Sequence, residues 1–126
     1  MLTTTGGFSG FSVDDLPKAL AFYRDTLGVK VIDSGMGLLL DVTGGAPVFV
    51  YDKPNHVPAE FTVLNFKVAD IDTAVDELVS AGVELQKYPG TNQDEKGIAR
   101  GKASNMGPDI AWFLDPAGNI LSVLCN

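Results

Sequence analysis

Few side chains in this 126-residue chain are of the types that bind transition metals or act as catalytic bases. The chain has one histidine, His56, and one cysteine, Cys125. Zinc, iron and nickel sites usually take two or more imidazole or thiolate ligands, so a metal site here would consist mainly of carboxylates. A Ser-His-Asp arrangement would have to use His56, which lies in the proline-flanked segment 53–58. We expect His56 to be a surface or interface residue and Cys125 to be a small buried hydrophobe.

The overall charge and composition exclude several classes of partner. The chain has 16 acidic and 9 basic residues and a net charge of −7, whereas a nucleic-acid surface needs clustered lysine and arginine. No apolar run approaches the ~20 residues that cross a bilayer. A single cysteine cannot form an intramolecular disulfide, and no segment resembles a secretory signal. We therefore expect a cytoplasmic protein that binds neither nucleic acid nor membrane.

The chain contains an internal repeat that relates its two halves. When residues 8–20 are laid over residues 63–75, Phe11 meets Phe66 and Asp15 meets Asp70. Alternating apolar residues before each aspartate predict a strand, and the aspartate suits a helix N-cap. Apolar residues at helical spacing follow each aspartate. The two expected helices end at Gly28 and Gly82.

Short apolar segments bounded by turn residues follow each expected helix. They predict strands at 30–34, 37–42 and 47–51 in the first half, and at 83–88, 109–114 and 119–124 in the second. The order of strand, helix and three strands, given twice, predicts an α+β fold of two tandem βαβββ modules. Residues 89–107 show no periodicity, which is typical of a loop that is either mobile or functional.

Two motifs at opposite ends of the chain resemble a known family. They are Asp-Leu-Pro-Lys-Ala-Leu-Ala-Phe-Tyr at 15–23 and Asp-Pro-Ala-Gly-Asn at 115–119. With the duplicated βαβββ order, they resemble the vicinal-oxygen-chelate superfamily, which includes glyoxalase I, extradiol dioxygenases, fosfomycin-resistance enzymes and bleomycin-resistance proteins. The resemblance implies a single domain over 1–126 with modules at about 7–53 and 60–125. It also implies a cup-shaped, partly open mixed β-sheet barrel with helices outside, commonly completed by a second chain in a homodimer.

The enzymes that the sequence resembles place metal ligands at four positions facing the cup. Three of the matching positions hold Phe8, Val63 and Ser122, and the fourth falls within 48–51, which contains no imidazole or carboxylate. A divalent ion needs several oxygen or nitrogen donors to replace its water shell, and this set does not supply them. We expect neither a metal nor another cofactor.

Alternation along the expected strands predicts which side chains face the cup. It places Phe8, Ser12, Val63, Asn65 and Lys67 in the cup, with Phe11, Val13, Leu64, Phe66 and Val68 under the helices. In the last hairpin it sends Phe113 and Ser122 to the cup and Trp112 beneath the second helix. Tyr51 would lie at the rim, and Arg100 would approach an anionic ligand if the long loop closed as a lid. The predicted ligand-binding residues are Phe8, Ser12, Tyr51, Val63, Asn65, Lys67, Arg100, Phe113 and Ser122.

A mostly apolar cup with a few polar groups is the composition of a small-molecule site. The first hypothesis is therefore a protein that lacks the usual metal ligands and binds a small molecule, acting as a homodimer. The alternative is a lyase, isomerase or dioxygenase-like enzyme with a noncanonical or metal-free site that uses Lys67, His56 or Arg100. A third possibility is a structural or regulatory homodimer whose cup is filled by its own side chains.

Overall fold

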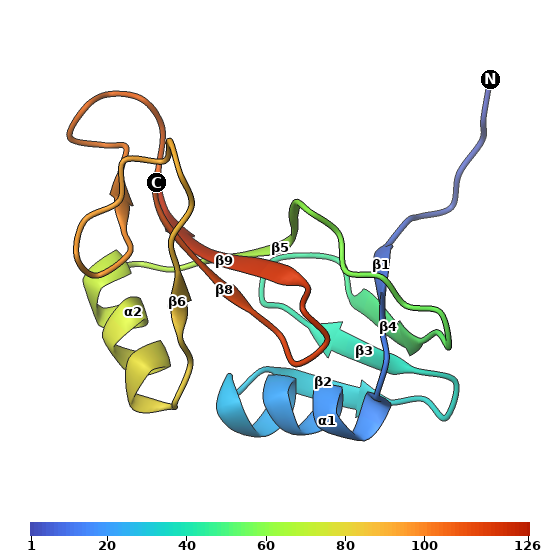
Figure 1. Cartoon of the computed structure of the whole chain (residues 1–126). Helices are drawn as coiled ribbons and strands as arrows, with labels where there is room; N and C mark the ends of the chain where they lie inside the picture. The colour runs from blue at the N-terminus through green and yellow to red at the C-terminus, as the bar shows by residue number, and fades with distance from the viewer. The chain divides into compact units, whose positions relative to one another are not determined.

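A computed structural model describes all 126 residues as two compact units, Met1–Pro58 and Ala59–Asn126 (Figure 1). Each unit contains one mixed β-sheet and its own helix. The expected α+β class with two βαβββ-like modules is confirmed. No helix has the length and apolar character that crossing a bilayer would require.

The first unit has a four-stranded sheet in the order β1-β4-β3-β2. Strands β1 and β4 are parallel, while the other neighbours are antiparallel. The elements are β1 (Ser9–Val13), α1 (Leu16–Leu20), a π-helix η1 (Ala21–Thr26), β2 (Lys30–Asp33), β3 (Leu38–Asp41) and β4 (Val48–Asp52).

The first helix begins where its aspartate was expected to cap it, and it changes type before it ends. The Asp15 carboxylate accepts a hydrogen bond from the Lys18 backbone N–H at 3.0 Å, which satisfies one of the free donors at a helix N-terminus. From Ala21 onward the helix is of the π type, with the Leu27 N–H donating to the Phe22 carbonyl at 2.9 Å. This wider turn holds Tyr23, which is fully buried, with its ring centroid 6.2 Å from that of Phe11.

The second unit has β5, β9, β8 and β6 in that order, and β7 also pairs with β8. Strands β5 and β9 are parallel, and helix α2 packs on β8 and β9 (Figure 1). The elements are β5 (Thr62–Lys67), α2 (Ile71–Ser80), β6 (Leu85–Gln86), β7 (Ala99–Arg100), β8 (Asp109–Leu114) and β9 (Ile120–Cys125).

The hairpin between β8 and β9 is closed by the side chain of Asp115. This buried carboxylate accepts from the backbone N–H groups of Ala117 and Asn119, both at 2.9 Å, and from the Asn119 side-chain amide at 3.0 Å. Leu114 and Ile120 form the closing pair of the two strands. This turn sets the register of the hairpin and therefore decides which residues of β8 and β9 share a face.

The core of each unit lies between its sheet and its helix. In the first unit it includes Val13, Leu40 and Val50, which have no exposed surface. In the second it includes Phe113 and Leu121, which are also fully buried. Each sheet therefore has one face packed on its helix and another turned away from it. We call the sheet surface that is turned away from the helix the first distal face in the first unit and the second distal face in the second unit.

Candidate functional site

The first distal face presents a row of aromatic rings. Register places Gly10 beside Phe49 and Ser12 beside Tyr51, opposite the buried Val48 and Val50. The Phe49 and Tyr51 rings are stacked, with centroids 5.6 Å apart and an interplanar angle of 19°. Phe8, just before β1, meets Phe49 edge-on at 6.5 Å and is 70% exposed. We call Phe8, Phe49 and Tyr51 the aromatic platform.

Two glycines leave room for the central ring of the platform. A Cβ on Gly37 would lie 2.7 Å from Phe49 Cε1, and one on Gly10 would lie 3.2 Å from the Phe49 carbonyl oxygen. Sequence reasoning did not single out Phe49. It lies two residues before Tyr51 on the same strand, so the alternation that selected Tyr51 would also have selected Phe49.

Ser12 and His56 form a polar pair on the same unit. Ser12 Oγ lies 2.7 Å from His56 Nδ1, and both residues are half-buried. The connector after β4 turns back toward β1, and the His56 N–H donates to the Lys53 carbonyl at 3.0 Å. The expectation of a surface or interface histidine did not include this partner. No sequence signal joins two residues 44 positions apart, because only the path of the connector brings them together.

The second distal face combines hydrogen-bonding side chains with a tryptophan. Asn65, Ser122 and Trp112 are neighbours across β5, β9 and β8. Ser122 is buried, and its Oγ donates to Asn65 Oδ1 at 2.5 Å. The Trp112 Nε1 donates to Thr62 Oγ1 at 3.2 Å, and Tyr88 meets the indole edge-on at 5.8 Å. Lys67 lies at the end of β5 on this face and is exposed.

The predicted placement of Phe113 and Trp112 is wrong. Paired residues on antiparallel strands share a face, and the pairs here are Phe113 with Leu121 and Trp112 with Ser122. Phe113 therefore lies on the helix side with no exposed surface. The error comes from the register that the Asp115 turn imposes, because a shift of one residue exchanges the two faces. Trp112 takes the place on the distal face that was expected for Phe113.

The prediction for Val63 rests on a regular alternation that β5 does not keep. The register of β5 shifts between Thr62 and Leu64, so Val63 lies in a bulge and has no partner on β9. A bulge adds one residue to a strand and breaks its alternation of faces. Thr62 consequently shares the face of Trp112, to which it is hydrogen-bonded. Nothing in the sequence signals this bulge.

Arg100 does not lie on a distal face. Its guanidinium donates to both oxygens of Asp72, at 2.8 and 2.9 Å, and to Asp94 at 3.1 Å. Asp72 lies in the first turn of α2, so these contacts hold the long loop against the helix. The pairing with Asp72 raises the pKa of Arg100 further above its already high range. The expectation that Arg100 approaches a ligand in the cup is therefore wrong.

The same contacts lower the pKa of Asp72, which lies on α2. Hydrogen bonds from Arg100 and then from Lys96 hold the pKa of Asp72 far below its usual range. Asp94 is partly desolvated, which opposes its ionisation. The N–H of Ile98 and the Arg100 side chain nevertheless lower its pKa. Both carboxylates are therefore ionised and act as fixed partners for the loop.

The model of the family described as the Glyoxalase/Bleomycin resistance protein/Dioxygenase superfamily matches residues 7–123. The chain belongs to this superfamily. The resemblance carried by the two sequence motifs is thus confirmed.

Solved structures of similar proteins share the fold of this superfamily member at low sequence identity. A superfamily member from Sphaerobacter thermophilus is 23% identical over 96% of this chain and 98% of its own, with a TM-score of 0.66. TnmS3, an antibiotic-binding protein from a Streptomyces species, is 21% identical over 98% of each chain, with a TM-score of 0.67. The fosfomycin resistance protein FosX from Listeria monocytogenes is 14% identical over 99% of this chain and 95% of its own, with a TM-score of 0.67.

The side chains at the positions where this superfamily's enzymes hold a metal do not fit a divalent ion. Phe8 and Val63 carry no donor atom, and Ser122 donates its hydroxyl proton to Asn65. Elsewhere, no group of three or more histidine, cysteine, aspartate or glutamate side chains is arranged to hold a metal ion. The distal faces offer ring surfaces, a Ser-His pair and a Ser-Asn pair instead. These groups suit the binding of an organic molecule.

Proposed function

We propose that this superfamily member binds a small, partly aromatic molecule on its first distal face without a metal ion. The observation that carries the proposal is the aromatic platform beside the Ser12–His56 pair. Phe49 and Tyr51 are already stacked on each other, so a planar ligand meets a preformed ring surface and little side-chain ordering opposes binding.

The polar groups next to the rings supply orientation and specificity. The Ser12–His56 pair can both donate and accept a hydrogen bond, because a neutral imidazole has one nitrogen of each kind. Sites for small molecules combine apolar and aromatic walls with a few placed polar groups in this way. TnmS3, which has the same fold, is an antibiotic-binding protein, and this supports the proposal by analogy.

Binding can be measured by isothermal titration calorimetry. A panel of one-ring and two-ring aromatic compounds, together with bleomycin, would be titrated while the calorimetric heat is followed. Tyr51→Ala should weaken binding roughly three- to tenfold, because an aromatic contact contributes about 0.5–1.5 kcal/mol beyond its buried area. Phe22→Ala, which removes a ring in contact with Tyr23 on the helix side, should change affinity less than twofold.

Two outcomes would contradict the proposal. One is that no compound of the panel binds with a Kd below about 1 mM, which corresponds to roughly −4 kcal/mol. The other is that Tyr51→Ala and Phe22→Ala have the same effect on affinity. Urea unfolding of each variant would show that a lost affinity does not come from a lost fold.

The metal-free part of the proposal has its own test. Protein purified without chelator would be analysed for bound metals and then heated with Ni²⁺, Zn²⁺, Fe²⁺ or Mn²⁺. A ligand that binds only the native state must raise Tm by mass action, so we expect a change of less than about 1 °C. Stoichiometric metal together with a rise of several degrees would overturn the metal-free claim.

A second candidate function is metal-free acid-base catalysis on a small metabolite. The 2.7 Å contact between Ser12 Oγ and His56 Nδ1 favours it, because an imidazole in contact with a hydroxyl can transfer a proton near neutral pH. Arg100 no longer belongs to this candidate, since Asp72 and Asp94 hold its guanidinium.

Turnover assays separate this candidate from the binding proposal. The hemithioacetal of methylglyoxal and glutathione would be assayed with EDTA present. Turnover that persists in EDTA and is lost in His56→Gln, with the fold intact, would favour the enzyme. We expect no turnover, in agreement with the binding proposal.

A further inference from the structure

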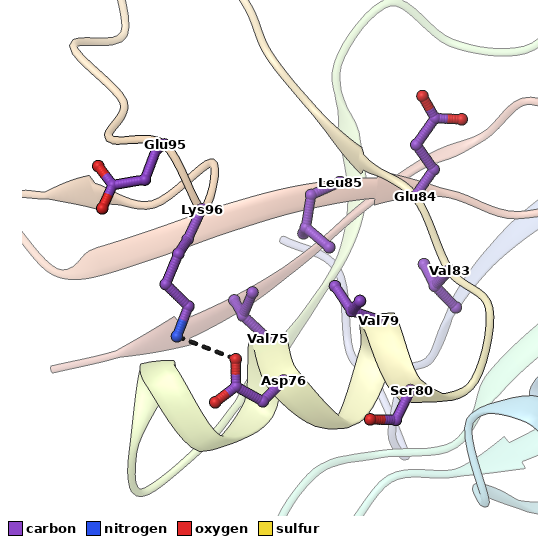
Figure 2. Close-up of a pocket in the computed structure, with 9 residues that line it drawn as sticks. All are labelled: Val75, Asp76, Val79, Ser80, Val83, Glu84, Leu85, Glu95 and Lys96. Atoms are coloured by element: carbon purple, nitrogen blue, oxygen red, sulfur yellow. Dashed lines mark ion pairs between the residues drawn. The ribbon is translucent and has the colours of Figure 1, made fainter.

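The second unit has a groove on the helix side of its sheet, separate from the second distal face. It lies between α2 and the segment that leads into β6, and its volume is about 600 Å³ (Figure 2). Its floor consists of Val75 and Val79 from α2 together with Val83 and Leu85. We call this the helix groove. Its volume lies within the roughly 300–1,000 Å³ of sites that hold drug-sized molecules.

The floor of the helix groove leaves apolar surface uncovered. Val75 and Val83 are buried, whereas Val79 is 59% exposed and Leu85 is half-buried. In Figure 2 these four side chains extend into the space between α2 and β6. Apolar surface of this kind gains free energy when a ligand removes it from water.

The rim of the groove carries negative charge that the protein does not neutralise. The one cation at the groove, Lys96, lies 3.0 Å from a carboxylate oxygen of Asp72 and 3.0 Å from one of Asp76, so its charge is already balanced. Glu84 and Glu95 also line the groove, and neither forms an ion pair. Figure 2 shows them across from α2, on either side of Leu85.

We propose that the helix groove is a second ligand site, which takes a small organic cation with an apolar body. The alkyl or aryl part would cover Val79 and Leu85, and the ammonium group would lie beside Glu84 or Glu95. The two carboxylates would repel an anion of the same shape. The proposal for this site does not rest on the function proposed for the first distal face.

The test compares two amphiphiles that differ only in the charge of the head group. Decyltrimethylammonium and decyl sulfate, both kept below their micelle concentrations, would be titrated into methyl-labelled protein at low salt. The cation should shift the methyl resonances of Val75, Val79 and Leu85, and decyl sulfate should bind at least about tenfold more weakly. Equal affinities, or shifts that avoid these methyl groups, would overturn the proposal.

Variants then test each half of the site. The double variant Glu84→Gln with Glu95→Gln should weaken binding of the cation about tenfold. Glu77→Gln with Glu60→Gln removes the same charge from exposed positions outside the groove, and should change affinity less than twofold. Equal effects of the two double variants would show that affinity for the cation depends only on the net charge of the protein, and would overturn the proposal.

The apolar half needs a substitution that keeps the fold. Val79→Ser removes an exposed side chain from the floor and should weaken binding about threefold or more, while Val57→Ser, at an 80% exposed position, should have no effect. Tyr51→Ala should leave the shifts of the groove methyl groups unchanged. If Tyr51→Ala abolished them, the cation would be binding at the aromatic platform and the inference would fail.

Discussion

Trp112 and Phe113 are adjacent in the chain and have opposite surroundings. Phe113 packs on the helix side of β8 with no exposed surface, while Trp112 lies on the second distal face against Thr62 and Tyr88. Both residues are aromatic and both belong to an apolar strand, so their types do not distinguish them. The register of one hairpin decides which of the two residues lies in the core and which lies on the distal face, because a shift of one residue exchanges the two faces.

Substitutions at Phe113 and Tyr51 test this assignment. Phe113→Ala should lower the free energy of unfolding by about 3–5 kcal/mol, because it leaves a cavity in a closed core. Tyr51→Ala, at a 36% exposed position, should cost less than half as much. Urea unfolding at pH 7 would measure both, with Phe113→Leu as the milder variant if Phe113→Ala does not fold. A Phe113 variant as stable as Tyr51→Ala would contradict the assignment.

Asp72 is the residue of α2 to which two side chains of the segment 89–107 donate hydrogen bonds. Its carboxylate accepts hydrogen bonds from Nη1 and Nη2 of Arg100 and from the ammonium of Lys96, at distances from 2.8 to 3.0 Å. These partners are partly exposed, so water and salt weaken the attraction. The contacts nevertheless depress the pKa of Asp72 in the folded state, and this connects folding to pH.

The sign of this pH dependence follows from proton binding. The Asp72 pKa is lowered in the folded protein, so near pH 2–4 the unfolded chain, with its usual aspartate pKa of about 3.9, binds more protons. The stabilisation from Asp72 is therefore present above about pH 4 and is lost as pH falls below it. Asp72→Asn should be less stable than the unmodified protein at pH 7, and the difference should shrink toward pH 2. Urea unfolding across this range would measure it.

A matched control for Asp72 is available on the same helix. Glu77 lies on α2, is exposed and forms no ion pair. Glu77→Gln should show the same pH dependence as the unmodified protein. If Asp72→Asn behaved like Glu77→Gln at every pH, the ion pairs with Arg100 and Lys96 would contribute nothing to stability.

At the scale of elements, the segment 89–107 is more ordered than its lack of periodicity indicated. The Gln93 side chain accepts from the Tyr88 N–H at 2.8 Å and donates to the carbonyls of Gln86 and Gly97 at 2.9 and 2.7 Å. Ile98 is fully buried, and β7 pairs with β8. One amide side chain thus supplies the backbone partners that a regular strand would otherwise provide.

Replacing Gln93 should release this segment without unfolding the unit. Gln93→Ala removes the hydrogen bonds to Tyr88, Gln86 and Gly97, so limited proteolysis should cut within 89–107 several times faster. The free energy of unfolding should fall by about 1.5–4.5 kcal/mol, since each of the three bonds contributes about 0.5–1.5 kcal/mol net. Gln93→Glu keeps the acceptor and loses the donors, so its cleavage rate should be intermediate. Unchanged cleavage in Gln93→Ala would show that Gln93 does not hold the segment.

At the scale of the whole chain, the duplication is visible in matching roles. Asp15 and Asp70 cap corresponding helices through their carboxylates, and in each unit the strand before that helix pairs in parallel with the last strand. The copies differ in the helix itself, because the first becomes a π-helix and the second remains an α-helix over Ile71–Ser80. The chain also exposes several large apolar side chains, among them Phe8, Val57 and Phe61.

These exposed apolar groups, together with the edge strands of each sheet, favour association with a second copy. We predict a homodimer. Size-exclusion chromatography with light scattering at micromolar concentration should give twice the 13.3 kDa of one chain. A monomer at that concentration would contradict the prediction.

Local signals in the sequence were sufficient for the fold and the family. Aspartate caps, glycine stops and alternation act over a few residues, and they predicted both βαβββ modules, while the motifs at 15–23 and 115–119 carried the resemblance to the family. The candidate site needed the tertiary structure, because its geometry depends on pairing between distant residues. The Asp115 turn exchanged Trp112 for Phe113, and the connector brought His56 to Ser12. The types of these residues do not specify these contacts, because each contact depends on the register or the path of the backbone between the partners.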